Sequence, residues 1–252
     1  MKRVLTAAVA IPFVVFITVF SPDWLFALCI GLVCALAVDE FLSLAERKGI
    51  GRPGRWFLVP SALVAICFLG GANWVVTAFA FSALTLMTAM IFSERIETVL
   101  GRVGMGLAGV AYCSLTLGFI VMMPREQVLL LFAIIWIGDS AAFYVGRALG
   151  RHSLAAKVSP KKTIEGAAAG LIGSVVAGVI GAFFLGEPWL QVAGISAATA
   201  IAGQVGDLAE SVLKRSAGVK DSSSILPGHG GILDRLDSLF FAAPVFYWFF
   251  NA

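Results

Sequence analysis

The chain has 252 residues, of which 60% are hydrophobic and only 13% are charged. Soluble domains carry about 25% charged residues, so this composition excludes an ordinary globular protein in water and leaves little room for a separate soluble domain. The net charge of +3 is small, and we expect no nucleic-acid partner. The composition is typical of an all-α polytopic integral membrane protein.

Breaks at proline, glycine and charged clusters divide the apolar sequence into nine candidate membrane spans. A helix needs about 20 mostly apolar residues to cross a bilayer. The predicted spans are 4–20, 23–45, 56–70, 73–92, 103–123, 126–148, 164–185, 189–213 and 232–251. The third is short, which favours a tilted or partly interfacial helix. No small-residue cleavage site follows the first, so we expect it to be retained.

The basic residues predict how the chain is oriented in the membrane. Cytoplasmic loops of membrane proteins are enriched in Lys and Arg. If the N-terminus lies in the cytoplasm, nine crossings place all 18 basic residues except Arg125 on the inner side. The sequence therefore predicts a cytoplasmic N-terminus, an outer C-terminus and a site facing the cytoplasm from a bacterial inner membrane.

We expect a single integral domain over 1–252, with N-terminal membrane helices in 1–125 and catalytic helices and cytoplasmic loops in 126–252. Two inner loops, 147–163 and 214–231, stand out by length and charge. The span 164–185 carries small residues at every fourth position, which permits close approach of another helix. These small residues are Gly166, Gly170, Ser174 and Gly178.

Acidic residues inside the apolar spans are the first functional candidates. A charge at the centre of a membrane helix costs at least about 2.5 kcal/mol, so such residues usually have a function. Asp139 and Asp207 both fall about 10 to 12 Å from the cytoplasmic ends of their predicted helices, and Asp39 and Glu40 fall at a similar depth. All four acids are expected in one polar cavity, or alternatively each pairs with a Lys or Arg that reaches in from the interface.

The segment 211–237 gathers polar residues at the cytoplasmic ends of the last two spans. They are Ser211, Lys214, Arg215, Lys220, Asp221, His229, Gly230, Gly231, Asp234, Arg235 and Asp237. Glycine lets the backbone approach a ligand, basic side chains bind phosphate oxygens, and carboxylates suit Mg²⁺. The pattern predicts a metal and polyphosphate site. A flexible solvated loop would share the glycines but would not need these paired charges.

The other inner loop ends in a second candidate anion site. Ser159 is placed as a helix cap and Pro160 as the first helical residue, so we expect a helix to begin here. A helix N-terminus beside Lys161 and Lys162 would bind an anion. Alternatively, the two lysines set the topology or contact anionic lipid headgroups.

These motifs resemble those of the phosphatidate cytidylyltransferases, also called CDP-diacylglycerol synthases. The resemblance rests on Ser-x-x-Lys-Arg from Ser211, the Lys-Asp pair, Pro-Gly-His-Gly-Gly and Asp-Arg-x-Asp, which ends at Asp237. Asp139 with Phe-Tyr-Val-Gly-Arg from 143, and the stretch 159–166 that includes Thr163, are also similar. All of these motifs lie within 139–238. The first half of the chain matches only in its succession of spans.

The resemblance implies a Mg²⁺-dependent reaction of CTP with phosphatidic acid, which yields CDP-diacylglycerol and pyrophosphate, and a homodimer. We expect Asp207 and Asp234 to meet at one divalent-metal site, with Asp237 and Asp139 as further ligands and two cation sites in all. The candidate catalytic residues are Asp207, Asp234, Lys220, Asp221 and His229. The candidate substrate-binding residues are Ser211, Lys214, Arg215, Lys161, Lys162, Thr163, Gly230, Gly231 and Arg235.

Two other functions are compatible with parts of the pattern. A CTP-dependent polyprenol or dolichol kinase would use the same nucleotide but transfer its γ-phosphate to an alcohol. A cation-coupled transporter would use acids at membrane depth, but transport alone does not need the charged segment 211–237, and no inverted repeat is evident.

Overall fold

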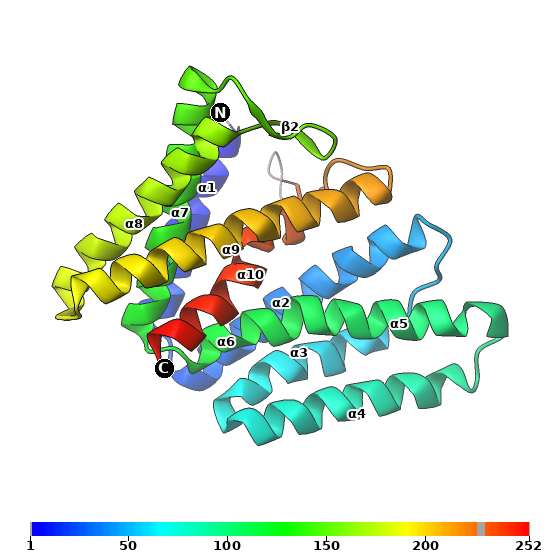
Figure 1. Ribbon diagram of the computed structural model, residues 1–252. Helices are drawn as coiled ribbons and strands as arrows, with labels where there is room; N and C mark the ends of the chain where they lie inside the picture. The colour runs from blue at the N-terminus through cyan, green and yellow to red at the C-terminus, as the bar shows by residue number, and fades with distance from the viewer. Residues whose placement is uncertain (1, 226–229, 252) are drawn as a thin grey trace. The chain divides into compact units, whose positions relative to one another are not determined.

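A computed structural model describes residues 2–225 and 230–251 of the chain, with side chains from residue 8 onward. Contacts between Cα atoms divide the chain into two compact units, each described by itself. The first comprises Met1–Met122 and Ser216–Leu236, and the second comprises Met123–Arg215 and Asp237–Ala252. Helices dominate both units (Figure 1).

The predicted all-α membrane architecture is confirmed in its main feature. Within the described residues, six helices are long and apolar enough to cross a membrane. They are Asp23–Glu46, Ala72–Met90, Ile96–Met122, Arg125–Leu149, Ile164–Leu185 and Trp189–Ser216. The other three predicted spans are also helical, but two are shorter apolar helices, Ala8–Phe20 and Arg55–Gly70, and the last carries three charges in its first turns. Nine crossings and their orientation stay predictions.

The first unit is a bundle of helices built largely around α2. Its elements are α1 (Lys2–Phe20), α2 (Asp23–Glu46), η1 (Arg55–Phe57), α3 (Leu58–Ile66), η2 (Cys67–Gly70), α4 (Ala72–Met90), η3 (Ile96–Thr98), α5 (Val99–Gly109), η4 (Val110–Leu115) and α6 (Thr116–Met122). Helix α2 packs against α3, α5 and α6, and α3 packs against α4. The π-helical turn η4 joins α5 to α6, so they form one long helical segment.

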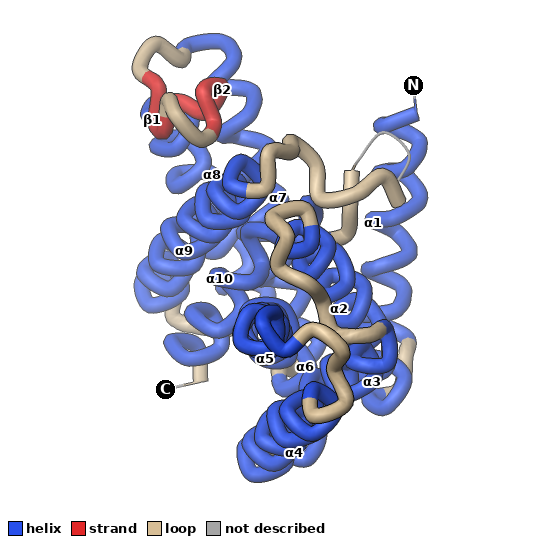
Figure 2. The backbone as a smooth tube through the Cα atoms, turned by 90° about the vertical axis from the view of Figure 1, so that its right-hand side faces the viewer, coloured by secondary structure: helices blue, strands red, loops and turns tan. Residues whose placement is uncertain are grey.

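The second unit pairs α7 (Arg125–Leu149) with α8 (Ile164–Leu185) through a short hairpin, β1 (Ser153–Ala155) and β2 (Ser159–Thr163) (Figure 2). It also contains most of α9 (Trp189–Ser216) and of α10 (Leu233–Phe250). Small residues set the α7–α8 spacing, because a Cβ on Gly138 would lie closer than 3.0 Å to Ser174 Oγ. Ser174 Oγ donates to the Ile134 carbonyl at 2.8 Å. The predicted packing role of the small-residue series is confirmed.

The predicted helix start at Ser159 and Pro160 is wrong. These residues lie in β2, which pairs with β1 in antiparallel register, Ser153 with Thr163 and Ala155 with Ser159. Helix α8 begins later, at Ile164, where Thr163 Oγ1 accepts a hydrogen bond from Gly166 N at 3.1 Å. A two-stranded hairpin consists of edge strands, where a proline without an N–H is tolerated. The strand therefore replaces the expected first helical turn.

Candidate active site

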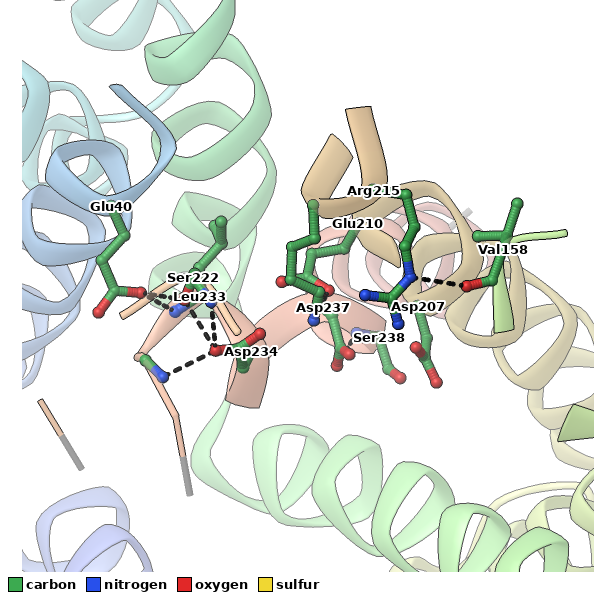
Figure 3. A network of polar contacts seen from close by, with 12 residues as sticks. Glu40, Val158, Asp207, Glu210, Arg215, Ser222, Leu233, Asp234, Asp237 and Ser238 are labelled. Atoms are coloured by element: carbon green, nitrogen blue, oxygen red, sulfur yellow. Dashed lines mark hydrogen bonds and ion pairs between the residues drawn. The ribbon is translucent and has the colours of Figure 1, made fainter. Parts of the chain in front are cut away.

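In the first unit, Glu40 on α2 holds the segment that joins α9 to α10. Its side chain is buried and accepts four hydrogen bonds, of which Figure 3 shows those from Ser222 and Leu233. Oε1 accepts from Ser223 Oγ at 2.6 Å and from Ile232 N at 3.0 Å. Oε2 accepts from Ser222 Oγ and Leu233 N, both at 2.8 Å. One carboxylate therefore fixes two stretches of the segment, 222–223 and 232–233.

Asp234, in the first turn of α10, ties the same segment together. One of its oxygens, Oδ2, accepts from Ser222 N at 2.9 Å and from Gly231 N at 2.7 Å, and it lies 2.8 Å from Ser222 Oγ, whose single proton it shares with Glu40. Gly230, at a φ of +82°, adopts a left-handed conformation that glycine accommodates without strain. A Cβ on Gly231 would lie closer than 3.0 Å to both Ser222 Oγ and Glu40 Oε2. The two glycines are therefore required by the local geometry.

In the second unit, Asp237 lies within electrostatic reach of three other carboxylates, which come from two further helices. Asp237 on α10 interacts electrostatically with Asp207 and Glu210 on α9 and with Asp139 on α7. The side chains of Asp207, Glu210 and Asp237 are drawn in Figure 3. The close approach of α9 to α10 depends on Gly206, because a Cβ there would lie closer than 3.0 Å to the Asp237 carbonyl oxygen. We call Asp139, Asp207, Glu210 and Asp237 the acidic cluster.

Basic side chains partly balance the acidic cluster. Lys162 on β2 forms an ion pair with Asp207, and Lys214 pairs with the fully buried Glu210 one helical turn away, at 2.5 Å. Arg215 Nε donates to the Val158 carbonyl at 3.2 Å, which links the end of α9 to the hairpin. The sequence did not predict the Lys162–Asp207 pair, because the two residues lie far apart in the chain. Both residues were nevertheless candidates on their own.

Comparison with known proteins identifies the family. The model of the cytidylyltransferase family matches residues 1–252. The chain belongs to the cytidylyltransferase family. Three similar relatives are each named phosphatidate cytidylyltransferase. The protein from Synechocystis sp. is 30% identical over 98% of this chain and 95% of its own length. That from Staphylococcus haemolyticus is 35% identical over 85% of both chains, and that from Staphylococcus aureus (strain COL) is 32% identical over 96% of both.

A cytidylyltransferase handles a triphosphate, and the acidic cluster offers oxygen ligands suited to a hard cation. Mg²⁺ commonly binds only one or two protein carboxylates and completes its shell with water and substrate phosphates. Within the described part of the chain, no group of three or more His, Cys, Asp or Glu side chains is placed to hold a metal ion. Mg²⁺ needs only one or two protein carboxylates, and Asp207 and Asp237 are two residues of this chemical type.

The remaining candidate residues lie in varied surroundings. Lys161, Lys220, Asp221 and Arg235 are exposed, whereas Ser211 is buried in α9. His229 lies outside the described residues. Asp207 belongs to the second unit and Asp234 to the first, so the metal site that they are expected to share stays a prediction.

Two acidic residues in α2 have different partners. Asp39 pairs with Arg52 at 3.2 Å, which confirms the alternative interpretation of an acid neutralised from the helix end. Glu40, its neighbour, binds the α9–α10 segment instead. Sequence reasoning flagged Glu40 as an acid at membrane depth but missed this role. The run Ser222-Ser223-Ser224 was the available signal, because hydroxyl donors commonly satisfy a buried carboxylate.

Proposed function

We propose that this chain transfers the cytidylyl group of CTP to phosphatidic acid and yields CDP-diacylglycerol and pyrophosphate for phospholipid biosynthesis. The observation that carries the proposal is the family match along the whole chain, joined to relatives of 30 to 35% identity named phosphatidate cytidylyltransferase. Six helices long and apolar enough to cross a membrane, found among the described residues, agree with a lipid substrate.

In this reaction a phosphate oxygen of phosphatidic acid attacks the α-phosphorus of CTP. A new P–O bond forms while the bond from the α-phosphorus to the bridging oxygen breaks, and pyrophosphate leaves with that electron pair. The attacking phosphate is already ionised at neutral pH, so it needs no strong general base. Catalysis then depends on placing the two phosphates together and neutralising their charge.

We assign the phosphate groups to basic side chains around the two cytoplasmic loops, namely Lys161, Lys162, Lys214, Arg215 and Lys220. Lys162 and Lys214 support this assignment because each is held by a carboxylate, Asp207 or Glu210. Side chains that are already ordered lose less conformational entropy when they bind a ligand. Ser211, Thr163, Gly230, Gly231 and Arg235 complete the proposed substrate-binding set, and Asp221 and His229 the proposed catalytic one.

We propose that Asp207 and Asp234 share a Mg²⁺ site, with Asp237 and Asp139 as further ligands and two cations bound in all. The bound metal would neutralise charge that builds up on the triphosphate during transfer. The carboxylate oxygens of the acidic cluster support this proposal, because Mg²⁺ prefers hard oxygen ligands.

The proposed activity predicts where label from CTP appears. Purified protein with phosphatidic acid, Mg²⁺ and CTP labelled in the cytidine is expected to form a labelled lipid, whereas label in the γ-phosphate should leave as pyrophosphate. Chelation of the divalent metal with EDTA should stop both. A polyprenol or dolichol kinase would instead place the γ-label in the lipid and release CDP. Substrate flux into sealed vesicles without any product would favour the transporter.

We further propose that the protein lies in the bacterial inner membrane with nine crossings, a cytoplasmic N-terminus and a cytoplasmic active site, and that it forms a homodimer. The bacterial origin of the relatives and the segregation of basic residues support the location and topology. The homodimer rests on the family resemblance alone.

The topology predicts which positions an impermeant thiol reagent reaches in intact cells. In a background without the four native cysteines, a Lys220→Cys variant should react only after the cells are opened. A Gly71→Cys variant should react from outside, because Gly71 lies in a short outer turn of the proposed topology. Labelling of Lys220→Cys in intact cells would overturn the orientation.

A further inference from the structure

The Glu40 carboxylate contacts residues 222–223 and 232–233, which belong to the segment 211–237. Glu40 itself lies on α2, a helix that contains none of the motifs behind the family resemblance. Its four donors are two serine hydroxyls and two backbone N–H groups, all within residues 222–233. Two of them precede residues 226–229 in the sequence and two follow them. Each carboxylate oxygen accepts one bond from each pair, so Glu40 joins the two stretches.

Glu40 and Asp234 are linked through one shared residue. Ser222 Oγ lies 2.8 Å from Glu40 Oε2 and 2.8 Å from Asp234 Oδ2. Asp234 Oδ2 also accepts from the backbone N–H groups of Ser222 and Gly231. Because these bonds share donors and neighbouring residues, a shift of Glu40 would shift the position of Asp234.

We propose that Glu40 is a positioning residue for cytidylyl transfer, which fixes residues 222–223 and 232–233 and thereby the orientation of Asp234. This inference rests on the proposed function. A carboxylate buried in an apolar helix is costly unless it is fully hydrogen-bonded. Here its donors come from the segment that carries the proposed chemistry. The network therefore fits a role in holding reactive side chains rather than in packing helices together.

Neighbouring residues offer a matched pair of variants. Glu40→Gln keeps the size of the side chain but replaces one acceptor oxygen by an NH₂ group that faces donors. Asp39→Asn makes the same chemical change one residue earlier, where the partner is Arg52 and not the segment. Ser223→Ala removes a single donor to Glu40. The folding of Glu40→Gln and of Ser223→Ala is checked by size-exclusion profile and melting temperature.

We expect Glu40→Gln to lower kcat/KM for CTP by about 10- to 100-fold, as loss of supporting hydrogen bonds commonly does, while Asp39→Asn stays within about twofold of the unchanged protein. The double variant Glu40→Gln/Ser223→Ala should lose less than the product of its two single losses, since both act through one contact. A purely structural role would lower the melting temperature without this coupling in kcat/KM.

Hydrogen exchange gives a readout that does not need activity. The backbone N–H groups of Ile232 and Leu233, which donate to Glu40, should exchange faster in Glu40→Gln and, if that variant does not fold, in Ser223→Ala. Unchanged exchange, or equal losses of kcat/KM in Glu40→Gln and Asp39→Asn, would overturn the positioning role. If the unchanged protein forms no cytidine-labelled lipid, the proposed function fails, whereas the exchange result still decides whether Glu40 holds the segment.

Discussion

Replacing Asp207 or Asp234 by Asn is expected to remove nearly all turnover while the protein stays folded and membrane-inserted. Each change deletes a negative charge that we propose holds Mg²⁺. At Asp207 it also leaves Lys162 without its carboxylate partner. The double variant should cost little more than either single one, because residues that act as a unit are not additive. The measurement is product formation per folded protein at saturating CTP.

The bonds of Asp234 separate a structural role from a charge-dependent one. Its Oδ2 accepts from the backbone N–H groups of Ser222 and Gly231 and contacts Ser222 Oγ, so it holds these two residues. The amide oxygen of Asn can still accept some of these hydrogen bonds, whereas Ala can accept none. If Asp234 only anchors the segment, Asp234→Asn should retain much more activity than Asp234→Ala. If its charge is needed, both variants should be equally inactive.

A control for these variants is Glu187→Gln, which changes an exposed acid in the turn between α8 and α9. It should leave turnover within about twofold of the unchanged protein, as expected for a surface substitution away from any site. Near-normal activity in either Asn variant would contradict the metal-site proposal, as would a double variant far worse than both.

Hydropathy predicted most of the fold because the membrane imposes a simple rule. Each of the nine predicted spans coincides with helical chain, since apolar helices satisfy their own backbone groups in lipid. The small-residue series in α8 likewise predicted its close packing. Charge patterns indicated which acids to examine, and Asp207 and Asp237 do lie in one acidic cluster with Asp139.

The features that were missed depend on partners distant in sequence. Ser159 and Pro160 have the local chemistry of a helix start, yet pairing with β1 places them in a strand. Glu40 is separated by about 180 residues from Ser222, and nothing in one sequence marks two such residues as neighbours. For Asp39, by contrast, the expectation that it pairs with a basic residue near the helix end is correct, because Arg52 lies only 13 positions away.

Replacing Gly231 by Ala is expected to be among the most damaging single changes in the chain, although it adds only a methyl group. Gly231 is buried, and its added Cβ would lie closer than 3.0 Å to Ser222 Oγ and Glu40 Oε2. Neither neighbour can move without breaking hydrogen bonds, because four donors hold Glu40 and Ser222 is bonded to Asp234. Backbone strain is not the reason for the expected loss. Gly231, unlike its neighbour Gly230, does not have a positive φ, so an alanine there would not be strained by its backbone conformation.

We expect Gly231→Ala to lower kcat by about 100-fold or more, because displacement of a reactive group by about 1 Å can cost that much. The matched control is Gly104→Ala on α5, where an added Cβ meets no atom within 4 Å and alanine favours the helix. Combining Gly231→Ala with Glu40→Gln should add little further loss, since the methyl group already disrupts the contact that Gln weakens. Normal turnover in Gly231→Ala would show that activity does not depend on the Glu40 and Asp234 hydrogen bonds.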